Sequence, residues 1–375
     1  MTTQRPVDWM AIACELGPAF AARADAHDAD NSFVADNYLA LKACRVFSAG
    51  VPSELGGGGA THAELCAMLR ELGRGCGSTA LALSMHTHLV AATVWRYRQG
   101  HSVEPLLRRI AAEQLVLVGT GASDWLASSG TAERTDGGYR VSGRKVFGSG
   151  SPAGDLLVTS APYDDPDEGP TVLHFPVPMR IAGVTVLDNW SAMGMRATGS
   201  HDVLLDRVFV PDGAVSLRRR NGKWHPFFNM VITVASPIVM SAYLGVAEAA
   251  HDLALQHLQR KRDDPEVWYL LGELENALTT AGLAVHGMVE LCAEYAFTPD
   301  VATVNAVLIR KTIAAQAVIT AVEKALEAVG GTGLLRSMGL ERLLRDVHGA
   351  QFHPLPAKRQ HRFTGRVALG LDPAG

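Results

Sequence analysis

Apolar positions recur along the chain with two different periods, and these periods divide it into three zones. From residue 6 to about 114 they return every three or four residues, as on one buried face of a helix. The segment THAELCAMLRELGRG at 61–75 is the clearest case. Here Thr61 is the expected N-cap, Glu64 completes a capping box, and Gly73 is the expected C-terminal stop.

Between about 115 and 213 the pattern changes to short runs rich in β-branched residues, divided by Gly, Pro, Asp and Ser, which predict strands. These runs are LVLVGT at 115–120, GYRVSG at 138–143, LLVTSA at 156–161, TVLHFPV at 171–177, GVTVL at 183–187 and HDVLLDRVFV at 201–210. Within ERTDGGYRVSGRKVF, turns are expected at Asp136-Gly137-Gly138 and at Ser142-Gly143. This zone predicts a small antiparallel barrel or sandwich.

From about 227 onward the helical period returns. The predicted helices 240–262, 266–296, 300–330 and 340–351 have the lengths of bundle helices, with breaks at 298–300 and 330–333. The chain is therefore expected to be an α+β protein with an N-terminal helical domain over 1–114, a middle antiparallel β domain over 115–226 and a C-terminal four-helix bundle over 227–375.

Composition narrows the class of protein. The 375 residues are 47 % hydrophobic and 19 % charged, which favours a folded chain with a large core over a disordered one. A formal net charge of -4 gives no electrostatic reason to expect a nucleic-acid partner. The five cysteines are scattered, so a reducing, cytoplasmic setting is expected. The uncharged run 230–246 contains Pro237 and is slightly short of a membrane span, which favours a buried helix.

Two stretches of small and hydroxyl residues follow predicted strands, GTGASD at 119–124 and FGSGS at 147–151. Small residues let backbone N–H groups approach a planar or phosphorylated ligand, and hydroxyl groups can bond ring heteroatoms. A plain turn is the alternative for each stretch. The sequence GGTG at 330–333 follows a helix and is not GxGxxG, so it does not predict a Rossmann fold.

Histidines form the other group of candidate residues. His86 and His88 are two positions apart on a predicted helix, so their side chains diverge and cannot share a metal ion well. His348 and His353 lie near the C-terminus. Each of these four histidines is either a functional residue or a structural one whose ring is bonded within the core. No metal site is expected.

The order of the zones and four local stretches resemble the acyl-CoA dehydrogenase superfamily over essentially the whole chain. The stretches are GTGASDWLASSGTAERTDGGYRVSGRKVFGSGSPAGDLLVTSA at 119–161, WSAMGMRATGS at 190–200, GGTG at 330–333 and LERLLRD at 340–346. The resemblance implies a flavoprotein that holds FAD between the β zone and the last helical zone. It also implies a homo-oligomer, a tetramer or a dimer of dimers.

The same resemblance assigns contacts to the cofactor. Thr120 and Ser123 in the first loop, and Phe147 and Ser149 in the second, match positions that contact the flavin ring. Gly330, Gly331 and Gly333 match a contact to the dinucleotide end of FAD, usually made across a subunit boundary. The family's Arg-x-x-Phe-Gly stretch is replaced by KRDDP at 261–265, which leaves FMN as an alternative to FAD.

One departure from the family bears on the reaction. In its common dehydrogenases a Glu beyond the Arg-Asp pair removes the α-proton of an acyl thioester, and here that place is taken by Pro354, which cannot accept a proton. Other members carry the Glu on the first long C-terminal helix, where Glu248 and Glu266 are available. His353-Pro354 instead resembles the ending of the family's flavin-dependent monooxygenases, which take reduced flavin from a separate reductase and form a C4a-hydroperoxide.

In that branch three side chains flank the hydroperoxide, and the matching residues here are His353, Ser149 and a histidine of the N-terminal zone, either His88 or His86. The prediction is thus a reduced-flavin monooxygenase of a small organic substrate, with His353, His88 and Ser149 as catalytic residues and a flavin reductase as an allowed partner. An FAD-dependent acyl-CoA dehydrogenase and a non-catalytic flavin-fold scaffold stay open. For His353 the alternative is a cap at the end of the last helix.

Overall fold

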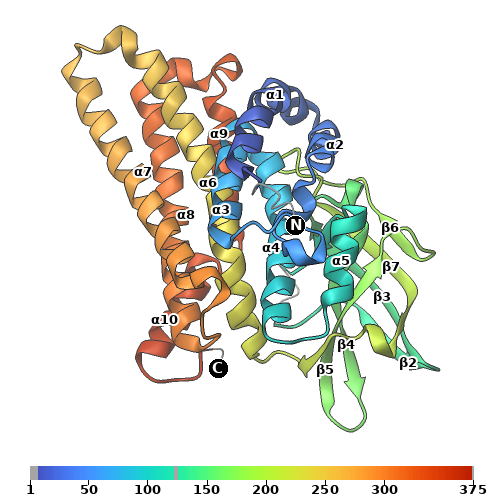
Figure 1. Ribbon diagram of the computed structural model, residues 1–375. Helices are drawn as coiled ribbons and strands as arrows, with labels where there is room; N and C mark the ends of the chain where they lie inside the picture. The colour runs from blue at the N-terminus through green and yellow to red at the C-terminus, as the bar shows by residue number, and fades with distance from the viewer. Residues whose placement is uncertain (1–6, 122–125, 374–375) are drawn as a thin grey trace.

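The computed structural model describes residues 7–121 and 126–373 and arranges them in three parts (Figure 1). The β domain lies on one side, the long C-terminal helices lie on the other, and the N-terminal helices lie between them. The N-terminal helices are α1 (Trp9–Asp30), α2 (Ala35–Ala43), α3 (His62–Gly75), α4 (Gly77–Arg98) and α5 (Glu104–Glu113).

Helix α3 begins as predicted but ends differently. Thr61 accepts a hydrogen bond from the backbone N–H of Glu64, whose side chain in turn accepts from the N–H of Thr61. The predicted stop at Gly73 is wrong, because the helix runs through it to Gly75. A Cβ at Gly73 would lie 2.5 Å from the carbonyl oxygen of Ala242, so this glycine allows α3 to approach α6 closely.

The middle domain consists of two four-stranded sheets packed around one apolar core. One sheet has the order β1-β4-β5-β8 and the other β2-β3-β7-β6. Every pairing is antiparallel except that of β1 with β4, which is parallel. The strands are β1 (Leu117–Gly119), β2 (Thr131–Thr135), β3 (Gly138–Gly148), β4 (Leu156–Asp165), β5 (Gly169–Pro178), β6 (Val184–Val186), β7 (His201–Pro211) and β8 (Leu217–Arg220).

The predicted turn at Ser142-Gly143 is wrong. Strand β3 continues through these residues, and its register with β7 shifts between Val141 and Gly143, which is a β-bulge. A Cβ at Gly143 would lie 2.8 Å from the Cα of Gly130, so the glycine is required by a close backbone approach.

The C-terminal part contains α6 (Pro226–Leu258), α7 (Pro265–Cys292), α8 (Val301–Val329), α9 (Leu340–Val347) and α10 (Ala357–Ala368). Helix α6 packs against α3 and α4 on one side and against α7 and α8 on the other, so it joins two apolar cores. Within the described residues, α6 and α8, each taken with the 3-10 turn that follows it (Pro226–Lys261 and Val301–Leu334), are long and apolar enough to cross a membrane. In the first, however, 89 % of the apolar window is buried inside the protein. The N-terminal helical, middle β and C-terminal helical arrangement predicted from the sequence is confirmed.

Candidate functional site

Strand β4 bonds to Thr120 of the first predicted flavin loop and to strand β3, whose last two residues begin the second loop. Thr120, directly after β1, is buried, and its hydroxyl is 2.7 Å from the hydroxyl of Thr159 on β4. The next residue on β4, Ser160, accepts a hydrogen bond of 2.6 Å through its carbonyl from the buried amine of Lys145 on β3. Strand β4 is therefore bonded to the strands that lead into both loops. Ser123, the other predicted contact of the first loop, lies outside the described residues.

The second loop presents an aromatic side chain and a hydroxyl group. Phe147 has a φ of 59°, in the left-handed region, and its ring is half exposed with an edge-on contact to Trp190 at 6.1 Å. Ser149 lies two residues on, and its hydroxyl is 2.8 Å from that of Ser200. An exposed ring and nearby hydroxyl groups are suited to a planar heteroaromatic ligand.

Ser149 ends a chain of hydroxyl groups whose direction can be worked out. The hydroxyl of Thr198 donates to the carbonyl of Met195 at 3.0 Å, since a carbonyl can only accept. Ser200 lies 2.7 Å from Thr198 and must therefore donate to it, which leaves Ser149 as the donor to Ser200. Each hydroxyl has one proton, so Ser149 retains only its capacity to accept.

These residues fit a flavin. Gly121 in the first loop is exposed, and among the described residues no atom lies within 4 Å of a Cβ placed there; the half-exposed ring of Phe147 borders the second loop. Hydroxyl groups next to an exposed aromatic ring match the polar edge and the flat apolar face of an isoalloxazine.

The predicted glycine contacts lie elsewhere in the chain. Helix α8 ends at Val329, and Gly330, with a φ of 77°, begins a short 3-10 turn over Gly330–Leu334 that contacts α8 and α9. Gly331 is exposed, whereas Gly333 is buried against Leu326. A cofactor contact of this turn across a subunit boundary stays a prediction.

His353 lies among buried polar side chains from other helices. Its Nε2 is 2.8 Å from the hydroxyl of Tyr243 on α6, and its carbonyl accepts a hydrogen bond of 2.7 Å from the amine of Lys311 on α8. Burial, followed by the charge of Lys311 and by His88, lowers the pKa of His353 to about 3. The imidazole is therefore neutral at pH 7, which argues against a positively charged helix cap.

The two N-terminal histidines differ in their surroundings. His86 is buried; its Nε2 lies 2.8 Å from the carbonyl of Phe47, and its Nδ1 accepts from the N–H of Leu117 at 2.9 Å. His88 uses only Nδ1, at 3.0 Å from the carbonyl of Ser84, and no described residue hydrogen-bonds to its Nε2. Burial lowers the pKa of both histidines to about 4. Of the two, His88 retains a ring nitrogen for a ligand.

The two carboxylates that could replace the missing Glu are paired or exposed. Glu248 is buried and pairs with Arg70 through contacts of 2.8 and 2.9 Å to Nε, with Arg74 at 4.0 Å. It therefore joins α6 to α3. Glu266 is exposed in the first turn of α7, where its backbone N–H donates to Asp264.

Two of the family-like stretches meet each other. The N–H of Met195 donates to the buried carboxylate of Asp346, and Arg345 donates to the carbonyl of Met193 at 3.0 Å. Burial raises the pKa of Asp346 to about 6. The contacts of Met193 and Met195 with α9 fix the segment after β6. Because Thr198 donates to the carbonyl of Met195, they also fix the chain of hydroxyl groups that ends at Ser149.

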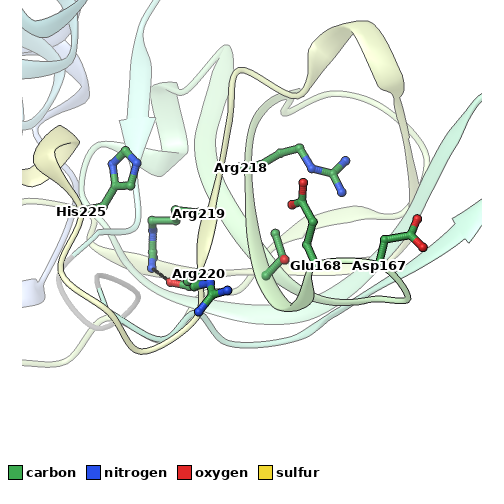
Figure 2. A pocket seen from close by; sticks show the side chains of 7 residues that line it. Asp167, Glu168, Arg218, Arg219, Arg220 and His225 are labelled. Atoms are coloured by element: carbon green, nitrogen blue, oxygen red, sulfur yellow. Dashed lines mark hydrogen bonds between the residues drawn. The ribbon is translucent and has the colours of Figure 1, made fainter.

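An open hollow with a volume of about 550 Å³ lies on the β domain, and it is not the site predicted from the sequence. Figure 2 shows the side chains that line it. Acidic and basic side chains mix there, and Arg218 is paired with Asp165 and donates to the hydroxyl of Tyr139 at 2.9 Å. None of the predicted site residues lines it; those that do are Asp167, Glu168, Thr171, Arg218, Arg219, Arg220 and His225.

Sequence reasoning missed Tyr243 and Lys311, which contact His353 from α6 and α8. A signal was present for both. Tyr243 lies within the uncharged run 230–246, and Lys311 is a cation on a largely apolar helix, and both side chains are buried. Buried polar groups of this kind need partners, so each predicts a specific contact.

Helical N- and C-terminal domains around a two-sheet β domain with hydroxyl-rich loops define a flavoprotein class, and comparison with known proteins agrees. Residues 16–114 match the acyl-CoA dehydrogenase N-terminal domain, and residues 238–356 match the acyl-CoA dehydrogenase C-terminal domain. The chain is 30 % identical over 370 residues to the amino sugar nitrososynthase DnmZ of Streptomyces peucetius, covering 94 % of this chain and 91 % of that protein.

Two further relatives span most of the chain. Dibenzothiophene monooxygenase of Rhodococcus qingshengii is 28 % identical over 350 residues, covering 84 % of this chain and 82 % of the relative. The structure of KijD3 in complex with FMN and dTDP-3-amino-2,3,6-trideoxy-4-keto-3-methyl-D-glucose has a TM-score of 0.88 at 29 % identity, covering 98 % and 96 % of the two chains. The chain belongs to the acyl-CoA dehydrogenase superfamily, its cofactor is a flavin, and its relatives include the flavin monooxygenase branch.

Proposed function

We propose that this protein is a reduced-flavin monooxygenase that acts on a small organic substrate. The observation that carries the proposal is the exchange of a carboxylate for the pair His353-Pro354. Glu248 is held by Arg70, and Glu266 is exposed at the start of α7, so neither is a free, buried base for α-proton abstraction.

The residues of the site have separable tasks. When bound, reduced flavin would supply the two electrons with which one atom of O₂ enters the substrate and the other leaves as water. Thr120 and Phe147 would hold the ring, and Ser149, left as an acceptor, suits a reduced ring because that ring carries additional N–H groups. His353 is neutral at pH 7, so it can donate a hydrogen bond to a developing oxyanion without protonating it early.

The proposal extends to the form of the flavin and to assembly. We propose reduced FMN supplied by a reductase, since the Arg-x-x-Phe-Gly stretch is missing and the KijD3 structure contains FMN. Large apolar side chains are exposed on the C-terminal helices and the turn after α8, which supports a homo-oligomer, as expected from the family. They include Trp268, Tyr269, Leu283, Leu334 and Leu335, which are 55 to 78 % exposed.

The test supplies chemically reduced FMN or FAD, O₂ and a substrate panel, and measures oxygenated product against hydrogen peroxide. The names of the relatives suggest the first substrates, a nucleotide-linked amino sugar and dibenzothiophene. Product formation without acyl-CoA supports the proposal. Bleaching of bound oxidised flavin by an acyl-CoA without a reductase would show a dehydrogenase, and absence of flavin binding in both redox states would show a scaffold.

A further inference from the structure

The contact between Tyr243 and His353 joins two residues far apart in the chain. Tyr243 is fully buried on α6, and His353 Nε2, at 2.8 Å, is the only hydrogen-bond partner of its hydroxyl among the described residues. A Cβ at Gly349 would lie 2.5 Å from that hydroxyl oxygen, so the glycine leaves the room that the phenol needs. The hydroxyl is therefore enclosed on one side by backbone and directed at the imidazole.

Counting protons determines which atom donates. The phenol has one proton, because burial raises the pKa of Tyr243 well above its ordinary value, and the neutral imidazole of His353 has one. If Nε2–H donated to the phenol, the buried phenolic proton would have no acceptor. That arrangement is disfavoured by a factor of at least about five in population. The phenol therefore donates to Nε2.

We propose that Tyr243 is a positioning residue that fixes the tautomer of His353, so that the imidazole carries its proton on Nδ1 and serves the site as a hydrogen-bond donor. The groups that face it support this assignment. The amine of Lys311 holds the carbonyls of His353 and Leu355 at 2.7 and 3.3 Å, which fixes the backbone on both sides of Pro354. Asp346, from α9, is close enough to Tyr243 to oppose ionisation of the phenol.

His88 has the opposite tautomer. The carbonyl of Ser84 can only accept, so Nδ1 of His88 donates to it at 3.0 Å and Nε2 keeps its lone pair. The site therefore combines a histidine that donates with one that accepts. The use of the two histidines in a reaction rests on the proposed function. The tautomers themselves follow from contacts within the protein.

The experiment observes the tautomers directly, in the full chain without flavin. Protein labelled with ¹⁵N-histidine is studied by long-range ¹H–¹⁵N correlation NMR, whose cross-peak pattern distinguishes Nδ1–H from Nε2–H imidazoles. His353→Gln identifies the His353 signals by their loss. In the wild type, the Nδ1–H form is expected to exceed the Nε2–H form at least about fivefold. In Tyr243→Phe this excess is expected to disappear.

Tyr295→Phe is the matched control, because Tyr295 is also a buried phenol and its hydroxyl has no partner within the described part of the chain. It should leave the His353 pattern unchanged. A wild-type His353 in the Nε2–H form would overturn the inference, even if Tyr243→Phe does not fold, and so would an unchanged pattern in a folded Tyr243→Phe. An Nδ1–H wild type that forms no oxygenated product would support the tautomer and contradict only the proposed function.

Discussion

His86 and His88 lie two residues apart on α4 and have opposite surroundings. His86 faces the junction between the N-terminal helices and the β domain, where both ring nitrogens bond to backbone, one to Phe47 and one to Leu117. His88 is close enough to His353 to contribute to lowering its pKa, and only one of the His88 nitrogens is used by a described residue. The first histidine joins domains, and the second keeps a nitrogen for a ligand.

The difference shows that the number of ring nitrogens bonded to the protein is more informative than burial alone. Burial lowers the pKa of both residues to about 4, so the direction of the pKa shift does not separate them. The comparison can be tested by substituting these histidines and the other residues of the predicted site. The largest effect is expected on catalysis, followed by effects on stability, on cofactor affinity and on the pH dependence of stability.

The largest effect is expected on oxygenation. His353→Gln should lower oxygenated product by about 10²-fold, the usual scale for loss of a group that handles a proton, while the melting temperature stays nearly constant. Oxygen consumption should continue, with more hydrogen peroxide released. The ratio of product to peroxide with reduced flavin is the measurement.

The control is His286→Gln, a histidine that is mostly exposed on α7. It should leave the product-to-peroxide ratio unchanged. If His353→Gln shows the wild-type ratio, the catalytic role of His353 is wrong, and with it the grouping of His88 and His353 in one site.

The second effect is expected on stability. His86→Ala removes two buried hydrogen bonds and leaves the carbonyl of Phe47 and the N–H of Leu117 without these partners, so the free energy of unfolding should fall by about 2 kcal/mol. His88→Ala, which removes one contact to Ser84, should lower it by about 1 kcal/mol or less. Urea unfolding measures both. Equal losses would contradict the distinction between the two histidines.

The third effect concerns the cofactor loops. Ser149→Leu places a bulky side chain at the end of the hydroxyl chain and should weaken flavin binding at least about tenfold, which corresponds to about 1.4 kcal/mol. Ser149→Ala removes the acceptor together with the hydrogen bond to Ser200, but it adds no bulk, so it should weaken flavin binding less than Ser149→Leu. Fluorescence titration with FMN gives both dissociation constants, and a wild-type constant for Ser149→Leu would exclude this loop as the flavin site.

The smallest effect is a pH response. The pKa of His86 is about 4 in the folded protein against 6.5 ordinarily, so between these values the unfolded chain binds a proton that the folded chain does not. Stability should therefore rise with pH across this window and level off above it. His88, His174 and His353 act in the same direction.

His86→Gln preserves a donor and an acceptor but does not titrate. Between pH 7 and about 5.5 the wild type should lose about 1 kcal/mol more stability than this variant. Urea unfolding at a series of pH values checks the difference. Parallel pH profiles for the two proteins would show that His86 is not the neutral, doubly bonded residue described above.

The sequence was sufficient for features that depend on local pattern. The capping box of α3, the change from helical to strand periods and the break after Val329 follow from neighbouring residues. Strand β8 was missed because LRRR has no alternation of apolar and polar residues, and its place comes from pairing with β5. The Tyr243–His353 contact could not be predicted either, since it depends on how α6 packs against the 3-10 turn His348–Phe352 that follows α9.

The packing of α6 has a consequence for how the protein unfolds. Because this helix is a wall of both the N-terminal core and the bundle core, neither core can open without exposing apolar surface of the other. Helices α6 and α3 cross closely at Gly245 of α6 and Gly73 of α3. The backbone amides of α6 around this crossing should therefore exchange with deuterium only through global opening. A fragment that ends after β8 would lack this wall and would leave the inner faces of α3 and α4 in water.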